Sequence, residues 1–174
     1  KPLIINLFGP PGAGKSATRA GLFHLMKHEG FLVEEVNEYA KDVVYEKREE
    51  LLKHQNYIFA KQEQKMIRVK EVEFIITDCP LLLSAYYSKS LESYSKHFEP
   101  FVLDSFNAYH NINFFLKRTG PYNKSGRLQT EEESDLVGKE LEQYLRTHQI
   151  PYFLFDGNPD APKKILEVLK QYIM

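Results

Sequence analysis

The sequence contains very little cysteine and almost no excess of charge of either sign. Its single cysteine, Cys79, cannot form a disulfide within the chain, so we expect the reducing environment of the cytoplasm. The 23 lysine and arginine residues nearly balance the 24 aspartate and glutamate residues, for a formal net charge of −1. This balance favours neither a large nucleic-acid surface nor an anionic membrane surface, although it leaves room for a local basic patch.

Long apolar runs, repeats and low-complexity segments are also missing from the 174 residues. The apolar runs are short and interrupted by charge, so we expect no transmembrane helix and no membrane partner. The first residues, KPLIINLFGPPG, lead directly into a glycine-rich loop, and we therefore expect no signal peptide. The length and the absence of a linker predict a single domain over residues 1–174.

Apolar runs alternate with amphipathic stretches, which is typical of an α/β fold with βαβ units around a parallel sheet. The expected strands are Leu3–Phe8, Phe31–Asn37, Phe74–Thr77, Ile112–Leu116 and Tyr152–Phe155. The expected helices are Lys15–Glu29, Glu38–His54, Asn56–Val72, Leu81–Lys89, Pro100–His110, Glu132–His148 and Ala161–Tyr172. After the fourth strand, Thr119–Glu131 is rich in glycine and charged residues and is expected to form a loop.

The strongest motif is LFGPPGAGKSA, residues 7–17, which matches the phosphate-binding pattern G-x-x-x-x-G-K-[ST]. It lies between a predicted strand and a predicted helix, where backbone N–H groups and the positive helix end face an anion. Lys15 is expected to reach the terminal phosphates of a nucleoside triphosphate, and the Ser16 hydroxyl to bind Mg²⁺. We expect the nucleotide to contact Gly9, Pro10, Pro11, Gly12, Ala13, Gly14, Lys15, Ser16 and Ala17.

The segment FIITDCP ends an apolar run at Asp78, as in the Walker-B pattern, in which the aspartate lies near Mg²⁺. ATPases of the motor type usually carry a water-activating glutamate next, but Cys79 and Pro80 follow here. The Asn-Lys-x-Asp pattern that reads guanine is missing too, because Asn123 and Lys124 are followed by serine and glycine. These absences favour phosphoryl transfer to an acceptor over hydrolysis.

Transfer to a hydroxyl group needs a base, and Glu38 follows the predicted second strand at the sheet edge where ligands bind. A glutamate at the start of a helix can also have no role beyond stabilising the helix dipole. On position alone, both interpretations are open. The next helices offer Tyr39, which can stack on a base, and Gln62, whose amide can read a base edge. Aromatic residues on helices are more often core residues, so the acceptor pocket is the least specific prediction.

Cations over the transferring phosphate are the other requirement of a kinase. Lys117 and Arg118 end the predicted fourth strand, and Lys124 and Arg127 lie on the glycine-containing loop at about residues 119–131. This loop can close over the phosphates as a lid that excludes water, or it can be an ordinary solvated surface loop. Its place directly after a strand favours the lid.

Six segments together resemble the ATPase/kinase-like P-loop proteins of phages and bacteria. They are GPPGAGKSATRAGLF, VNEYAKD, YIFAKQ, IITDCPLLLS, NFFLKRTGPYNKSGRLQTEEE and IPYFLFDG. That group is related to the ribosylnicotinamide kinase domain of a bacterial NAD-biosynthesis regulator and is similar, more distantly, to nucleoside and thymidylate kinases. The resemblance implies a P-loop NTPase fold, a three-layer sandwich whose five-stranded parallel sheet has the order 2-3-1-4-5 with helices on both faces.

The resemblance also implies ATP and Mg²⁺ as cofactors in a bacterial or phage-infected cell. Glu38 matches the position of an acid near the acceptor, Asp78 matches the acid after the third strand, and Arg118 and Arg127 match the lid. Deoxynucleoside kinases usually have Asp-Arg-Ser where this chain has Asp78 followed by cysteine and proline, so their acceptor rules do not carry over. Asp78 is therefore expected to serve either the metal or the acceptor.

Together these patterns predict ATP-dependent phosphoryl transfer to a hydroxyl group of a nucleoside, a nucleotide or a modified pyrimidine. Some relatives in phages with modified DNA act on 5-hydroxymethyluracil within DNA, which makes DNA a candidate acceptor alongside small molecules. The alternative is an ATP-binding regulatory or accessory protein with slow hydrolysis. We expect a monomer or a homodimer.

Overall fold

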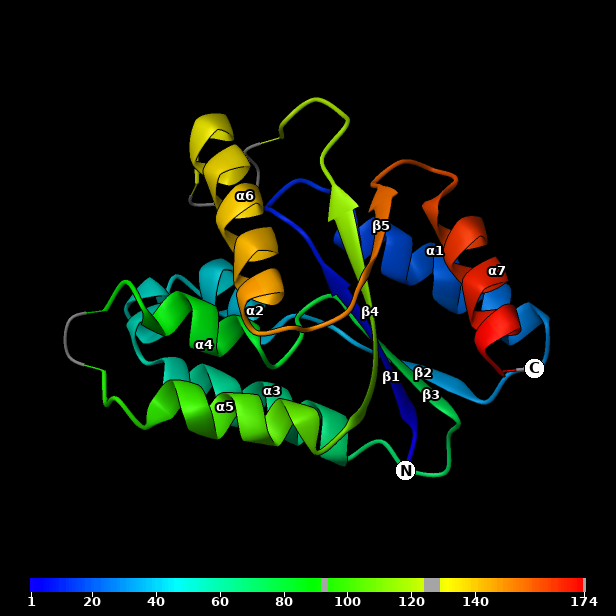
Figure 1. Ribbon diagram of the computed structural model, residues 1–174, viewed down its shortest axis with the longest axis horizontal. Coiled ribbons are helices and arrows are strands. Elements are labelled where there is room, and N and C mark those ends of the chain that lie inside the picture. The colour runs from blue at the N-terminus through cyan, green and yellow to red at the C-terminus, as the bar shows by residue number, and fades with distance from the viewer. Residues whose placement is uncertain (92–93, 124–128, 174) are drawn as a thin grey trace.

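Five parallel strands form the central sheet of the computed structural model, which describes residues 1–91, 94–123 and 129–173 (Figure 1). The strands are β1 (Leu3–Phe8), β2 (Val33–Val36), β3 (Phe74–Thr77), β4 (His110–Lys117) and β5 (Phe153–Asp156). Their order is β2-β3-β1-β4-β5, and all four neighbouring pairs are parallel. The predicted α/β fold and strand order are thereby confirmed.

The central strand β1 is covered on both faces, which explains its nearly continuous apolar sequence LIINLF. Its residues from Ile4 to Phe8 are all buried. The polar exception is Asn6, whose side-chain nitrogen donates to the side-chain oxygens of Asn111 (2.9 Å) and Asn113 (3.0 Å) on β4. The amide in the middle of the sheet therefore keeps its hydrogen bonds.

Helices cover both faces of the sheet and complete three layers (Figure 1). One face carries α1 (Lys15–His28) and α7 (Ala161–Ile173). The other side carries α2 (Tyr39–Tyr45), the 3₁₀ helix η1 (Glu49–Lys53), α3 (Gln55–Ile67), α4 (Leu83–Ser88), α5 (Phe98–Asn107) and α6 (Glu131–Thr147). Within the described ranges, no helix is long and apolar enough to cross a membrane.

Each helical layer packs on the sheet through its own apolar cluster. Leu22 of α1 and Ile165 of α7 belong to the cluster that contains Ile5 of β1. Phe59 of α3 and Val102 of α5 belong to the opposite cluster. Alternating side chains of β1 therefore face the two layers, as expected for a strand in the middle of a three-layer fold.

The prediction of one helix over Glu38–His54 was wrong, because α2 stops after Tyr45 and η1 follows as a separate turn. Lys47 between them has a φ of 57°, which no α-helix accommodates. Residues 46–50, EKREE, are all charged and offer no apolar face to pack on the core. The other differences are shifts of element ends, such as α3 ending at Ile67 and β4 beginning at His110.

Parallel strands bring the loops that follow them to the same edge of the sheet. Gly9 comes directly after β1, Glu38 follows β2, and Asp78 comes directly after β3. Arg118 comes directly after β4, and Gly157 comes directly after β5. The fold therefore gathers the predicted site residues from four separate parts of the chain, together with a glycine that the sequence did not single out.

Candidate active site

The loop between β1 and α1 has the backbone shape of a phosphate cradle. Gly12 and Gly14 have φ values of 82° and 81°, in the left-handed region that favours glycine. Gly14 is the N-cap of α1 and provides no side-chain cap, so the first N–H groups of the helix receive no side-chain oxygen at this position. These donors and the positive end of the helix are suited to bind phosphate oxygens.

The cradle is held in shape by the ends of β4 and β5. A Cβ atom at Gly9 would lie 2.5 Å from the carbonyl oxygen of Leu116 on β4. A Cβ atom at Gly157, after β5, would overlap the carbonyl oxygen of Ala13. The Gly157 N–H donates to the Lys117 carbonyl at 2.8 Å, which fixes this close approach. Both contacts need glycine because the two backbones touch.

Helix α6 supports the other side of the cradle. It begins with a capping box in which Thr130 and Glu133 satisfy each other's backbone N–H groups. One turn further on, the buried Ser134 hydroxyl donates to the Pro11 carbonyl at 2.5 Å. A Cβ atom at Gly138 would lie 3.1 Å from the Pro10 ring, so the helix and the loop are in close contact.

The Lys15 ammonium group bends back over the cradle. Its Nζ atom donates to the carbonyl oxygens of Gly9 (2.7 Å) and Pro10 (3.0 Å). The side chain therefore follows the curve of the loop and keeps its positive charge beside the cradle. This geometry fits the expected contact between Lys15 and the terminal phosphates.

A cavity of about 520 Å³ connects the cradle with a pocket between α2, α3 and α4. The predicted nucleotide contacts that line it are Gly9, Pro11, Gly12, Gly14, Lys15, Ser16 and Ala17. Pro10 and Ala13 are instead buried behind the loop, against α6 and Gly157. The far wall is mostly apolar and contains Val44, Leu52, Ile58, Leu83, Tyr87 and Leu91. One end of the cavity is thus suited to phosphate and the other to a flat, uncharged group.

Glu38 lines the cavity between these two ends, within electrostatic reach of Lys15 in the cradle and of Lys41 on α2. It is the N-cap of α2, yet its carboxylate makes no capping hydrogen bond, so the helix does not use this side chain in the usual way. Burial raises the pKa of Glu38 above its ordinary value. The neighbouring Asp78 charge raises it further, and the Lys15 charge opposes both. A half-buried carboxylate with a raised pKa beside a phosphate cradle is suited to accept a proton.

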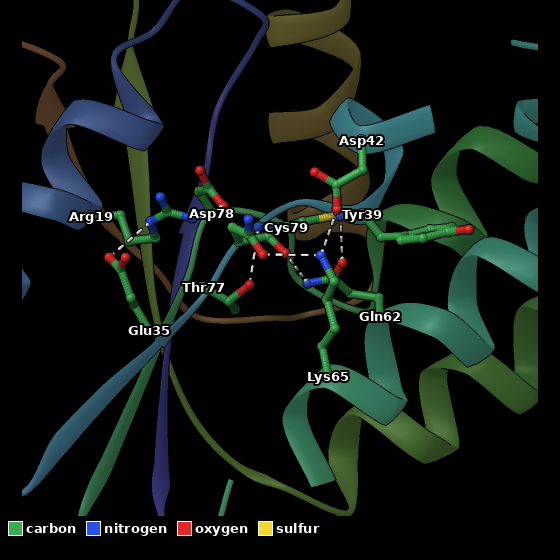
Figure 2. Close-up of polar contacts among 10 residues, drawn as sticks. Arg19, Glu35, Tyr39, Asp42, Gln62, Lys65, Thr77, Asp78 and Cys79 are labelled. Carbon is green, nitrogen blue, oxygen red and sulfur yellow. Dashed lines mark hydrogen bonds and ion pairs between the residues drawn. The ribbon is translucent and has the colours of Figure 1, made fainter. Parts of the chain in front are cut away.

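Asp78 is buried and belongs to an ion-pair chain (Figure 2). Arg19 lies between two carboxylates, with Nη1 3.3 Å from Asp78 Oδ1 and Nε 3.2 Å from Glu35 Oε2. Arg19 projects from α1 and Glu35 from β2. The sequence reasoning missed both residues, although Arg19 follows Lys15 by one helical turn and so had to face the same edge of the sheet.

Removing Arg19 is expected to destabilise the protein, because Asp78 would keep a buried charge without its cation. We expect Arg19→Met to lower the free energy of unfolding by about 3 kcal/mol, within the range for breaking a buried pair. Lys27→Met is the matched control, since Lys27 lies on the same helix and pairs with the exposed Glu34 of the same strand β2. The free energy of unfolding of the control should fall by less than about 1 kcal/mol. If urea unfolding gives the same loss of stability for both variants, the structural role of Arg19 is contradicted.

Mg²⁺ usually takes few protein ligands and completes its octahedron with phosphate oxygens and water. The described residues contain no group of three or more His, Cys, Asp or Glu side chains that could hold a metal ion by themselves. The Ser16 hydroxyl at the start of α1 and the Asp78 carboxylate after β3 supply oxygen atoms of the kind that Mg²⁺ prefers. These two residues would hold the ion together with the nucleotide.

Arg118 lies at the mouth of the cradle, with its Cδ atom 3.5 Å from the place of a Cβ at Gly12. Its guanidinium pairs with Asp135 (2.8 Å) and Glu131 (2.8 Å) at the start of α6. The Tyr122 ring also covers Gly12, and its hydroxyl donates to the Gln129 carbonyl. The predicted lid thus places two described residues, Arg118 and Tyr122, against Gly12, whereas Arg127 lies outside the described residues.

The candidate acceptor residues are placed unequally. Among the described residues that line the cavity are Glu38 and the unpredicted Gln55, but neither Tyr39 nor Gln62. The Tyr39 hydroxyl shares a hydrogen bond with the Tyr57 hydroxyl at 3.1 Å. Gln62 is buried, and both ends of its amide bind backbone atoms. In this structure the Gln62 amide therefore binds the protein's own backbone, and its contact with substrate stays a prediction.

Comparison with known proteins places the chain among P-loop proteins. A family model described as an AAA domain matches residues 4–160. Two structures of deoxyadenosine kinase from M. mycoides, with bound dATP and with bound dCTP, are each 20% identical to this chain, with TM-scores of 0.58 and 0.59. They cover 98% and 97% of this chain, and 100% and 99% of the kinase chain, and so share its fold. The comparison with curated proteins finds no match. Because the family model spans nearly all of the sequence, this protein belongs to that AAA domain family.

Proposed function

We propose that this protein is a kinase that transfers the γ-phosphoryl group of ATP to a hydroxyl group of a nucleoside, a nucleotide or a modified pyrimidine. The observation that carries the proposal is the single cavity that runs from the phosphate cradle to an apolar-walled pocket. Glu38, with its raised pKa, lies at the junction of the two parts. An acceptor bound in the second part would place its hydroxyl group beside the phosphates held in the first.

In the proposed reaction the backbone of the cradle and Lys15 hold the β- and γ-phosphates, and Ser16 and Asp78 would hold Mg²⁺, which would offset the phosphate charge. Glu38 orients the acceptor hydroxyl and takes its proton as the oxygen forms a bond to the γ-phosphorus. The bond between that phosphorus and the bridging oxygen breaks, and ADP leaves. Arg118 and Arg127 supply positive charge from the lid. Positioning and electrostatic stabilisation account for most of such a reaction.

Two observations favour transfer over the alternative of a regulatory ATP-binding protein. The residue after Asp78 is Cys79, a buried thiol whose pKa is raised by burial, so it cannot activate water as a carboxylate would. The structures with a similar fold are deoxyadenosine kinases with bound dATP or dCTP, which supports an acceptor of the nucleoside type.

Burial and the Glu38 charge raise the pKa of Tyr87, so its hydroxyl stays a hydrogen-bond donor in the acceptor pocket.

The proposal is tested by measuring ADP release from ATP and Mg²⁺ with a panel of acceptors. The panel contains nucleosides, nucleotides, ribosylnicotinamide and double-stranded DNA with 5-hydroxymethyluracil. At least one acceptor is expected to stimulate ADP release and to carry the label from γ-³²P-ATP. If no acceptor raises ADP release above that of the protein alone, the regulatory alternative is favoured. Labelling of the modified DNA but not of free nucleosides would assign the polymeric acceptor.

A further inference from the structure

The side-chain amide of Gln62 on α3 binds the backbone on both sides of Glu38 (Figure 2). Its Oε1 atom accepts from the Tyr39 N–H at 3.0 Å, and its Nε2 atom donates to the Asn37 carbonyl at 3.2 Å. Gln62 is only 2% exposed, so these bonds are shielded from competing water. A buried glutamine whose donor and acceptor are both satisfied has a fixed orientation.

These two hydrogen bonds hold both peptide groups of Glu38. The Asn37 carbonyl belongs to the peptide group before Glu38, and the Tyr39 N–H belongs to the one after it. Glu38 itself has an extended backbone, with φ −67° and ψ 119°, at the point where β2 gives way to α2. Fixing the two planes fixes these dihedral angles and therefore the direction in which the Glu38 side chain leaves the backbone.

Lys65, one turn further along α3, makes a second connection to the same segment. Its Nζ atom lies 3.0 Å from Asn37 Oδ1 and 2.9 Å from Asp42 Oδ2. Asn37 precedes Glu38, and Asp42 lies in the first turn of α2. One face of α3 thus holds the residues before and after Glu38, Gln62 through their backbone and Lys65 through their side chains.

We propose that Gln62 is a positioning residue for Glu38. It acts through the backbone of residues 37–39 to keep the Glu38 carboxylate at the junction of the cradle and the acceptor pocket. This role rests on the proposed kinase function, in which Glu38 must meet the acceptor hydroxyl. It explains why a glutamine that does not reach the cavity is nevertheless buried against the strand end that carries the candidate base.

The test is a double-mutant cycle with Gln62→Met and Glu38→Gln, measured with the best acceptor of the panel. Methionine has nearly the length of glutamine and removes both hydrogen bonds. We expect Gln62→Met to lower turnover by about 10- to 100-fold, because misplacing a catalytic group by about 1 Å can have an effect of that size. The KM for ATP should stay within about twofold of the wild-type value, since other elements form the cradle.

In the Glu38→Gln background, Gln62→Met is expected to lower turnover less than threefold, because the group that it positions is gone. A role in stability alone would instead lower turnover by the same factor in both backgrounds, and that result would overturn the proposal. Gln64→Met is the matched control on the exposed side of α3 and should leave turnover unchanged. If Gln62→Met does not fold, Lys65→Met takes its place in the cycle with the same criterion. Absence of acceptor-dependent turnover in the wild-type protein would instead contradict the proposed function.

Discussion

Glu38→Gln is expected to lower the rate of phosphoryl transfer by about 10²- to 10⁴-fold, the usual contribution of a general base. The affinity for ATP should change little, because the cradle that binds the phosphates is formed by backbone N–H groups and Lys15. Glu34→Gln makes the same chemical change on the exposed side of β2 and serves as the control. Single-turnover rates and ATP binding would be measured for both variants. Equal losses in turnover and ATP affinity for Glu38→Gln would assign Glu38 to the metal or to the fold.

The raised pKa of Glu38 adds two expectations of opposite sign. Wild-type turnover should fall as the pH is lowered through that pKa, since the base must be ionised, and Glu38→Gln should lose this dependence.

The free energy of unfolding should change with pH in the opposite direction to turnover. A carboxyl group with a raised pKa in the folded state favours folding below its unfolded pKa and loses this contribution as the pH rises through the folded value. Glu38→Gln should therefore melt at a higher temperature than the wild type at pH 7.5, with a smaller difference at pH 4. A lower melting temperature at pH 7.5 would contradict the cause given for the pKa shift.

Lys15→Met is expected to affect both binding and chemistry. The lysine charge acts on the phosphates in the bound nucleotide and again on the charge that develops during transfer, so turnover should fall by about 10³-fold. Titration calorimetry with Mg²⁺ and ATP should show a weaker affinity as well, in contrast to Glu38→Gln. Lys27→Met, an exposed lysine near the end of the same helix, should change neither quantity. Unchanged ATP affinity in Lys15→Met would mean that the ammonium group remains on the Gly9 and Pro10 carbonyls when the nucleotide binds.

The parts of the structure that the sequence predicted well are those set by local pattern. Apolar runs as long and continuous as that of Leu3–Phe8 have few ways to be buried, so the strands lie where they were expected. The phosphate-loop motif was recognised from its spacing. The strand order was predicted from a family resemblance, and the structure confirms that order. The roles of Glu38, Asp78 and Arg118 remain proposals, because they depend on bound molecules.

What the sequence did not predict depends on contacts between distant segments. Charged residues 46–50 contain no glycine or proline, yet the chain leaves the helix there because these residues offer no apolar side chain to pack on the core. Arg19 looks like an ordinary helix residue until β2 and β3 are placed beside it, and the sequence assigned Gln62 to a base edge rather than to the backbone after β2. Gln62 shows this most clearly, since an amide can bind a nucleobase or a backbone equally well, and only the position of residues 37–39 decides between them.

The contact between Gly157 and Ala13 also bears on how the chain folds during synthesis. The phosphate loop leaves the ribosome well before Gly157, because the whole stretch from α1 to β5 lies between them in the chain. The contact between Ala13 and Gly157 forms only after β5 has joined the sheet, so until then the loop lacks this part of its support. Protection of the chain by ATP against a protease is therefore expected to appear only when β5 is in place.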